Sequence, residues 1–176
     1  MTQPPSAAQL STLVGSRICH DLVNPLGAIG NGIELLAMAG SAEGPEMDLV
    51  SDSVTGAVAR VKLLRLAFGQ ANTDQSCSAT EVRDILSAVT AGSRLSHDWA
   101  SENDLSRRNV RLALLAAMCV ETALPLGGLI QIAQAGDRWI VQATQDRLNL
   151  DPALWAAMTT SACCPHWCPK RAANWP

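Results

Sequence analysis

A polar stripe headed by a histidine is the part of the sequence with residue types suited to chemistry. His20, Asn24, Gly27, Asn31 and Glu34 follow one another at steps of four and three residues, a spacing that places them on one face of a helix. Neutral imidazole carries a lone pair near pH 7, because its usual pKa is about 6.5, so it can attack an electrophile or accept a proton. A lone histidine is more often an ordinary surface or core residue, and the spacing alone leaves both interpretations open.

Two long helices must position this stripe. The first carries an apolar seam at steps of four and three residues, made of Leu22, Leu26, Ile29, Ile33 and Leu36. A second seam with the same spacing follows the linker at 39–45 and consists of Met47, Val50, Val54, Ala57, Val61, Leu64 and Phe68. A short linker between long helices predicts an antiparallel hairpin. On the first helix the polar stripe then faces water, opposite the seam.

The hairpin carries more apolar surface than two helices can cover. Two hairpins from two chains would form a four-helix bundle, and the regularity of both seams favours such a homodimer. The alternative is that the hairpin packs on the rest of its own chain.

Pro25 lies inside the first predicted helix, five residues after His20. It removes the hydrogen bond to the Asp21 carbonyl and crowds that group, at a cost of about 3 kcal/mol. A helix that keeps such a residue is predicted to bend there, beside the histidine, for a functional reason. A tolerated kink, or a helix that begins at Pro25, is the alternative.

The second half of the chain predicts an α+β layer. Ser78 and Glu81 form a capping box that opens a helix over 78–92, whose apolar face includes Val82, Ile85, Leu86 and Val89. The remaining segments are a strand at 94–100, a helix at 103–123, a β-hairpin at 129–134 and 138–144, and a short helix from Asp151 and Pro152. We therefore expect three parts, at residues 1–70, 71–158 and 159–176.

Composition excludes several classes of protein. The 176 residues are 48% hydrophobic and 16% charged with a net charge of −3, so the chain can bury a core and lacks the basic excess of a nucleic-acid binder. The sequence contains no run of about 18 or more apolar residues, so it predicts no membrane span. The N-terminus lacks the basic and apolar regions of a signal peptide, so we expect a cytoplasmic protein.

The cysteines predict neither disulfides nor a metal site. Cys19, Cys77 and Cys119 are scattered singly, and a cytoplasmic chain keeps such thiols reduced. The tail at 159–176 crowds together four soft ligands, Cys163, Cys164, His166 and Cys168. Their adjacent, Pro-rich spacing does not match the separated ligand pairs of a structural zinc site. We expect this tail to be disordered and His97 to be structural.

The stretch SRICHDLVNPLGAIGNGIELL (16–36) resembles the H-box of two-component signalling proteins. His20, Asp21, Asn24 and Pro25 match its pattern of a phosphoacceptor histidine, an acidic residue, and Asn-Pro at the fourth and fifth following positions. The continuation is similar to the ChpT-type histidine phosphotransferases of alphaproteobacteria, and the similarity extends plausibly to about residue 157.

That resemblance implies a phosphorelay protein. His20 would take a phosphoryl group from the aspartate of one response-regulator receiver, including that of a hybrid histidine kinase, and pass it to another. Asp21 would hold the imidazole or accept its proton, and Asn24 and Arg17 would contact the phosphoryl group or the partner. Gly27, Asn31 and Glu34 would lie under the docked receiver, which would supply Mg²⁺. Asp21 and Arg17 could equally be solvated surface charges.

The second domain is similar to the ATP-binding domain of histidine kinases, but it lacks the ATP-specific residues. No Asn occurs between Val110 and Ala123, and Gln145-Asp146-Arg147-Leu148 stands where a kinase has a glycine-rich turn. The resemblance therefore implies a degenerate domain that binds no nucleotide, in a chain without cofactor or metal. A kinase with a divergent ATP site and a non-catalytic dimeric docking scaffold remain the alternatives.

Overall fold

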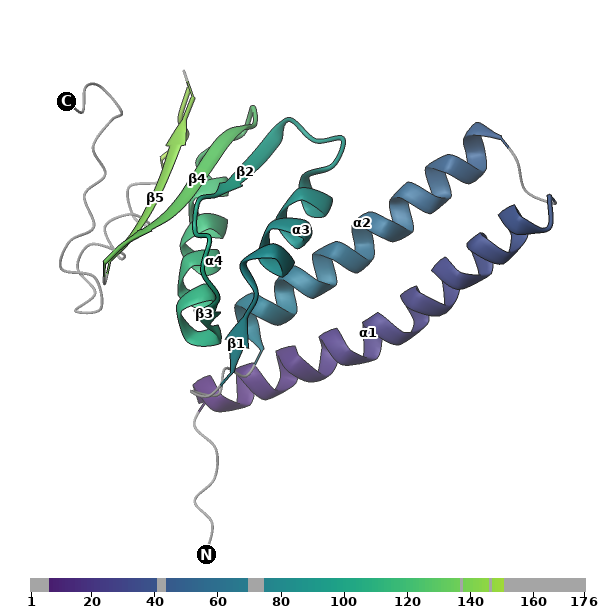
Figure 1. Cartoon of the computed structure of the whole chain (residues 1–176), viewed down its shortest axis with the longest axis horizontal. Coiled ribbons are helices and arrows are strands. Elements are labelled where there is room, and N and C mark those ends of the chain that lie inside the picture. The colour runs from purple at the N-terminus through teal and green to yellow at the C-terminus, as the bar shows by residue number, and fades with distance from the viewer. Residues whose placement is uncertain (1–6, 41–43, 70–74, 137, 146, 151–176) are drawn as a thin grey trace, which may run out of the picture.

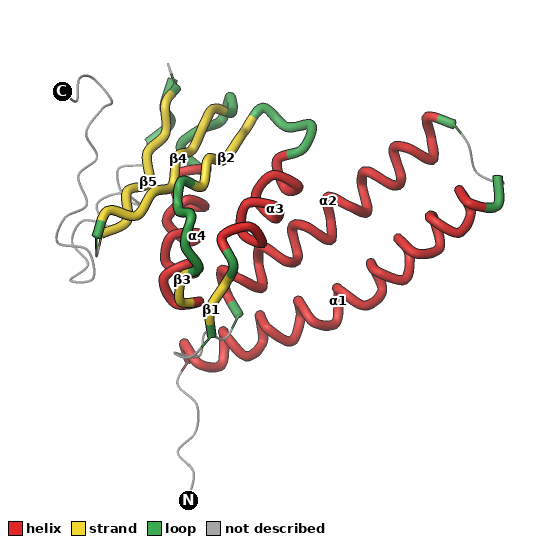
Figure 2. Tube along the Cα trace, viewed as in Figure 1, coloured by secondary structure: helices red, strands yellow, loops and turns green. Residues whose placement is uncertain are grey.

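The computed structural model describes residues 7–40, 44–69, 75–136, 138–145 and 147–150. It begins with two long antiparallel helices, α1 (Ala7–Met38) and α2 (Pro45–Phe68), followed by a smaller α+β half (Figures 1 and 2). The predicted helical hairpin is confirmed. Pro25 lies within α1, so the alternative of a helix that begins at Pro25 is wrong.

The two helices of the hairpin run past one another in a fixed register. Gly15 lies against Phe68 and Gly30 lies against Val54, so each step forward along α1 matches one step back along α2. Pro45 begins α2 at a position where a missing backbone N–H costs nothing. This register determines which residues of α2 lie level with His20.

The second half contains a three-stranded mixed sheet. β2 (Leu95–Trp99) pairs in parallel with β4 (Gly128–Ala135), which pairs antiparallel with β5 (Arg138–Thr144). Helices α3 (Ala79–Thr90) and α4 (Arg107–Glu121) lie between this sheet and α2 (Figure 1). A sharp turn leads from α4 into β4 at Gly127, where φ is 87° and a Cβ would collide with the Arg94 carbonyl. The predicted α+β class is confirmed.

Two local predictions about this half are corrected. The second of its helices begins at Arg107 rather than at 103, because the Ser106 hydroxyl accepts the Asn109 N–H and caps the helix there. Leu105–Ser106 (β3) instead pairs with Ser76–Cys77 (β1), a two-residue ladder that the sequence did not suggest. Ser78 does cap α3, but its hydroxyl accepts the N–H of Thr80 rather than that of Glu81.

One hydrophobic core joins α2 to the second half. The α2 side chains Leu63, Leu66 and Ala67 are buried together with residues of α3, α4 and the sheet, which include Val82, Leu86, Val110, Leu114, Ile130 and Ile132. Trp99 packs on Trp139 with ring centroids 5.3 Å apart, an arrangement that adds to simple burial. By contrast, α1 packs principally on α2.

The apolar seam of α1 remains half-exposed within one chain. Leu22, Ile29 and Leu36 are 45%, 50% and 48% exposed, whereas comparable side chains of α3 and α4 are buried. None of the described helices is long and apolar enough to cross a membrane. The predicted short helix from Asp151 and the tail at 159–176 lie outside the described residues.

Candidate functional site

His20 lies on the outside of α1, about four turns from its start, and its side chain is exposed. Asn24, one turn later, and Arg17, one turn earlier, are exposed on the same side of the helix. An imidazole in this position can be reached by a large partner without any movement of the chain. The exposure predicted for this part of the stripe is therefore observed.

The lower half of the stripe borders a groove that was not predicted. Asn31 and Glu34 are exposed, and together with Gly27 they line this groove beside Leu26 and Gly30. Gly27 and Gly30 have no side chains, so this wall of the groove is low and the backbone of α1 is accessible there. The residues predicted to touch a partner thus form one wall of a concave surface.

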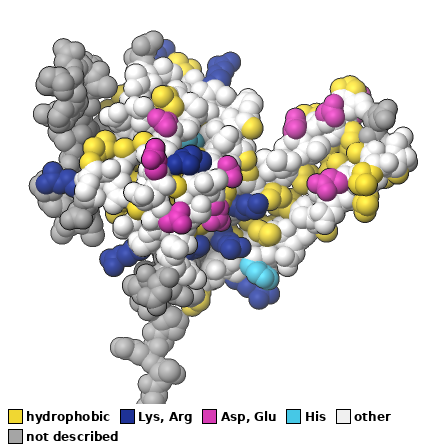
Figure 3. Space-filling view, in the orientation of Figure 1, with side chains coloured by type: hydrophobic (Ala, Val, Ile, Leu, Met, Phe, Trp, Pro, Cys, Tyr) yellow, Lys and Arg dark blue, Asp and Glu magenta, His cyan; other side chains and the backbone are white. Residues whose placement is uncertain are grey.

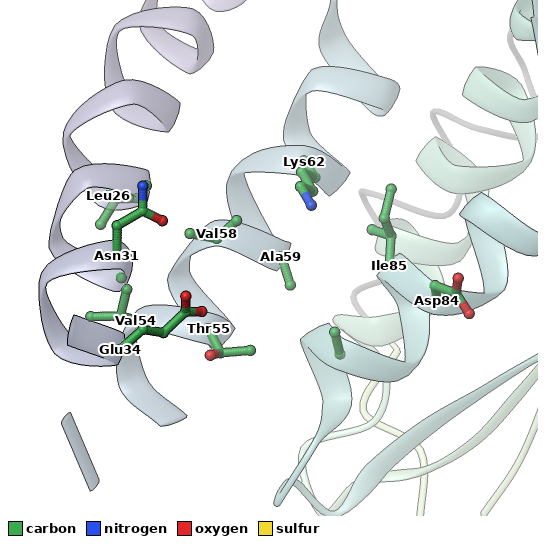
Figure 4. Close-up of a pocket in the computed structure, with 13 residues that line it drawn as sticks. Leu26, Asn31, Glu34, Val54, Thr55, Val58, Ala59, Lys62, Asp84 and Ile85 are labelled. Carbon is green, nitrogen blue, oxygen red and sulfur yellow. The ribbon is translucent and has the colours of Figure 1, made fainter. Parts of the chain in front are cut away.

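Helices α2 and α3 supply the other two walls of this interhelical groove (Figure 4). The α2 wall consists of Val54, Thr55, Val58, Ala59 and Lys62. The α3 wall consists of Asp84, Ile85 and Ala88. The groove has a volume of about 360 Å³, and Figure 4 shows Asn31, Glu34 and Lys62 directed into or along it.

Sequence reasoning missed the α2 and α3 walls. Thr55 and Lys62 are seven residues apart, on a face of α2 beside its apolar seam, and that spacing was the only signal available. Nothing in the sequence indicated that α3 would face α1 across a gap. That arrangement depends on how α3 packs on α2.

Positive charge lies on the hairpin at the level of His20. The register of the hairpin puts Lys62 level with Leu22 and Arg65 level with Ile18, within about one helical turn of the histidine. Figure 3 shows Lys and Arg side chains next to the exposed histidine on the hairpin. Both α2 residues are exposed, and such cations attract phosphoryl groups and acidic protein surfaces.

Asp21 and Pro25 complete the predicted site. Both lie within α1, but the Asp21 side chain is outside the part that the structure describes. Pro25 is exposed one turn beyond Asp21 and leaves the Asp21 carbonyl without its helical donor. The loss of this helical hydrogen bond, one residue after His20, is thus a local consequence of Pro25.

The other described histidine belongs to the core. His97 is 1% exposed at its side chain, and its Nε2 lies 3.0 Å from Glu121 Oε1, although the two groups are not aligned as a hydrogen bond. Glu121 is a partner that sequence reasoning did not anticipate. Among the described residues no group of three or more His, Cys, Asp or Glu could hold a metal ion.

The described cysteines are free and differ in environment. Burial raises the pKa of the Cys77 thiol, an effect that the nearby Arg107 guanidinium partly offsets. Burial also raises the pKa of Cys119. Thiols with raised pKa are poor nucleophiles, so neither is suited to covalent chemistry near neutral pH.

The chain after β5 turns back onto the end of α4. Gln145 Nε2 donates to the Gly127 carbonyl at 3.0 Å, and the Asn149 N–H donates to the Ala123 carbonyl at 3.0 Å. These bonds fix Gln145 and Asn149 against the turn between α4 and β4.

Comparison with known proteins finds relatives of this chain. Residues 79–165 match the family model for the histidine phosphotransferase C-terminal domain. The protein phosphotransferase ChpT of Brucella abortus (strain 2308) is 30% identical over 153 residues, which cover 84% of this chain and 73% of the relative. A solved structure described as "1.7 Angstrom Structure of a Bacterial Phosphotransferase" has a similar fold, with a TM-score of 0.53, 24% identity, and coverage of 85% of this chain and 74% of that one.

Proposed function

The chain belongs to the ChpT-like histidine phosphotransferases, and on that premise we propose that His20 relays a phosphoryl group between receiver-domain aspartates. The exposed imidazole on α1, at the level of Arg17 on the same helix and of Lys62 and Arg65 on α2, carries this proposal. The donor would be a phosphorylated receiver, such as that of a hybrid histidine kinase, and the acceptor the receiver of a response regulator.

In the transfer of the phosphoryl group, the imidazole of His20 is the only group of this chain that must form or break a bond to phosphorus. The unprotonated ring nitrogen of His20 attacks the phosphorus of an aspartyl phosphate, an N–P bond forms, and the acyl P–O bond breaks to release the aspartate carboxylate. The ring then loses its remaining N–H proton to water or to Asp21. Transfer to the second receiver runs the same steps in reverse, and Mg²⁺ held by each receiver would stabilise the transferring oxygens.

Neighbouring residues assist this step by position. Arg17 and Asn24 lie one turn to either side of His20 on an exposed face, within reach of a phosphoryl group or of the receiver loops around it. Lys62 and Arg65 of α2 add positive charge at the same level. The acidic pocket of a receiver would therefore be attracted to this end of the hairpin.

We propose that this chain takes phosphate from receivers and not from ATP. The segment after β5 is bonded to the end of α4 through Gln145 and Asn149, and it contains none of the glycines that would let backbone approach a nucleotide phosphate. The α4 residues from Val110 to Glu121 include no Asn to hold Mg²⁺.

The working protein is proposed to be a homodimer. Half-exposed Leu22, Ile29 and Leu36 on α1 lie at steps of seven residues, the spacing of a bundle seam. Pairing with a second hairpin would bury this seam and keep His20 on the outside. Ile29→Glu should convert the native dimer to a monomer in sedimentation analysis, whereas Ala28→Glu, at an exposed neighbouring position, should not.

The experiment that tests the function follows ³²P from a labelled phospho-receiver to the chain. Native protein should become labelled, and His20→Ala and His20→Gln should not, with circular dichroism confirming that both variants keep their helices. The label should be lost in acid and kept in base, as expected for an N–P bond. A parallel arm supplies labelled ATP without receiver and should give no label.

Each alternative predicts a different result. Label taken directly from ATP would identify a kinase. An equal effect of the native chain and His20→Ala on receiver output, without label on either, would identify a docking scaffold.

A further inference from the structure

We propose that the free edge of β5 pairs with β5 of a second copy of this chain, so that two second domains share one six-stranded sheet and their α4 helices pack together. Each copy contributes its three strands. Such pairing goes beyond the proposed relay and leaves His20 uncovered, because β5 lies at the margin of the described chain farthest from the hairpin (Figure 2).

The outer edge of β5 is unpaired among the described residues. The strands lie in the order β2, β4, β5, so β5 has a described neighbour on one side only. Its seven residues include no proline and no lysine, and Arg138 carries the only charge. Residues of those types are a usual means of keeping a strand edge from pairing. The chain that follows, as far as it is described, bonds to the turn between α4 and β4 through Gln145 and Asn149 and does not run along the edge.

The flank of α4 on the same side is apolar and open. Leu112, Ala116 and Cys119 lie at steps of four and three residues, which puts them on one face of the helix. Leu112 is 55% exposed, and Ala116 and Cys119 are half-buried. Helix α4 packs on α2, β4 and β5, while α3 packs on α2 and β2. The flank therefore lies on the β5 side of the second domain, and it has no charged residue between Arg111 and Glu121.

The sequence of β5 is complementary to itself when two copies run antiparallel. Val141 is the middle residue of the strand, so a two-fold axis beside it pairs every residue of β5 with one of the second copy. Trp139 then lies across from Ala143, and Arg138 lies across from Thr144. A large side chain thus meets a small one, and no like charges face one another across the pair.

A row of side-chain hydrogen bonds across the sheet ends at this edge. Gln142 Nε2 donates to Gln131 Oε1 at 2.9 Å, and Gln131 Nε2 donates to Asp98 Oδ2 at 3.3 Å. Within the described part of the chain no donor reaches Gln142 Oε1, which is left as an acceptor at the edge. In the antiparallel pair the two copies of Gln142 are diagonal neighbours, a separation of about 7–8 Å that long side chains can span. The row can therefore continue into the second copy.

The spacing of the layers suits this arrangement. Helix α4 packs on both β4 and β5, and neighbouring strands are about 4.8 Å apart, so the helix axis lies about 2.5 Å from β5. The two-fold axis would lie about 2.5 Å beyond β5 on the other side. The two copies of α4 would then be about 10 Å apart, which is the separation of packed helices. Small side chains at Ala116 and Cys119 allow this approach.

Sedimentation equilibrium of the full chain measures the association. Ile29→Glu is introduced first, to remove pairing through the hairpin seam. This parent chain should be a monomer at low micromolar concentration and become a dimer when the concentration is raised about 100-fold, as expected for a small interface. Ile140→Glu and Gln142→Lys each bring like charges to diagonal positions across the pair, and each should weaken dimerisation about tenfold or more.

Combining these two substitutions tests the register. In the double variant each new carboxylate lies directly across from a new ammonium group of the second copy, so dimerisation should return to within about threefold of the parent. Only a two-fold axis at Val141 places positions 140 and 142 opposite each other in this way.

Matched variants separate pairing from damage to the fold. Ser96→Lys adds a charge at an exposed position on the same face of the sheet, but on β2 at the other edge. Ala116→Arg fills the flank of α4 and should weaken dimerisation about tenfold. Ser87→Arg adds the same side chain at an exposed position on α3. Ser96→Lys and Ser87→Arg should change dimerisation by no more than about twofold.

Amide exchange distinguishes a second copy from another cover. Pairing should slow exchange of the outer N–H groups of β5 as concentration rises. Equal protection at every concentration would show that a segment of the same chain covers the edge, and the proposal would be wrong. A parent chain that stays monomeric, or a double variant as weak as the single ones, would also overturn it. Labelling of His20 by a phospho-receiver should be the same in the β5 variants as in their parent, so a failure of pairing leaves the relay untouched.

Discussion

Arg107→Ala should lower the free energy of unfolding measurably, because it removes a contact between the second domain and the hairpin. Arg107 Nη2 donates to the Arg65 carbonyl at 2.8 Å, in the last turn of α2. Its neighbour on the next turn, Arg111, donates from Nη1 to the Gly69 carbonyl at 3.3 Å. The first residues of α4 thus bind the carboxyl end of α2.

The size of the effect follows from what remains after the substitution. The Arg65 carbonyl still accepts the Gly69 N–H at 3.0 Å, so no acceptor is left unsatisfied. A hydrogen bond from a charged donor contributes about 1–2 kcal/mol at a partly exposed site, and a cation at a helix C-terminus adds about 0.5 kcal/mol. We expect the free energy of unfolding to fall by about 1.5 kcal/mol.

Urea unfolding measures this change. With an m-value of about 2 kcal/mol per molar urea, the midpoint should fall by about 0.7 M. Circular dichroism follows the helices, and fluorescence of the packed Trp99 and Trp139 follows the sheet. Arg107→Lys should recover only part of the loss, since lysine keeps the charge but not the planar fork.

The exposed neighbour Arg108 provides the control, and Arg108→Ala should leave the midpoint within about 0.2 M of the native value. A decrease in the urea midpoint of less than about 0.2 M for Arg107→Ala, or equal decreases for the two variants, would refute the conclusion that this contact stabilises the packing of α4 on the end of α2.

Three further predictions concern the helices, the core and pH. Pro25→Ala should stabilise α1 by about 1–3 kcal/mol, raising the melting temperature, yet slow labelling by a phospho-receiver; unchanged labelling would mean that Pro25 has no functional role. Leu114→Ala, at a side chain that is 1% exposed, should cost about 2–5 kcal/mol in urea unfolding, while Leu112→Ala, 55% exposed on the same helix, should cost under 1 kcal/mol. Because burial raises the pKa of Cys77 above its ordinary 9.0, the protonated thiol's contribution to stability is complete below about pH 9 and is lost as pH rises through the folded-state pKa. The urea midpoint should therefore fall from pH 8 to pH 10 less steeply for Cys77→Ala than for the native chain.

The helical hairpin and the β-hairpin of β4 and β5 could be predicted from sequence because their signals are local. The heptad spacing of both seams and the linker at 39–45 indicate two helices and the connection between them, although α1 begins at Ala7, well before the first residue of its seam. The turn around Gly136 separates two β-branched and aromatic runs that become β4 and β5. Each of these features depends on neighbours in the chain and not on distant contacts.

The two-residue strands and the groove could not be predicted. β1 and β3 exist because segments about thirty residues apart meet, and two residues carry no periodic signal. Likewise the stripe from His20 to Glu34 indicated which face of α1 is polar, but only the packing of α3 on α2 turns its lower half into a wall of the groove. His97 had no evident partner in the sequence for the same reason, since Glu121 reaches it from another element.

The shared core of α2 divides the hairpin into two cooperative units. Because Leu63, Leu66 and Ala67 are buried with the sheet, the amide protons at this end of α2 can exchange with solvent only when the whole second half opens. Those of α1, which packs principally on α2, can exchange through separation of a single helix. Among the described elements, α1 is thus expected to open at least cost, and a bound partner that covers it would slow its exchange more than that of α2.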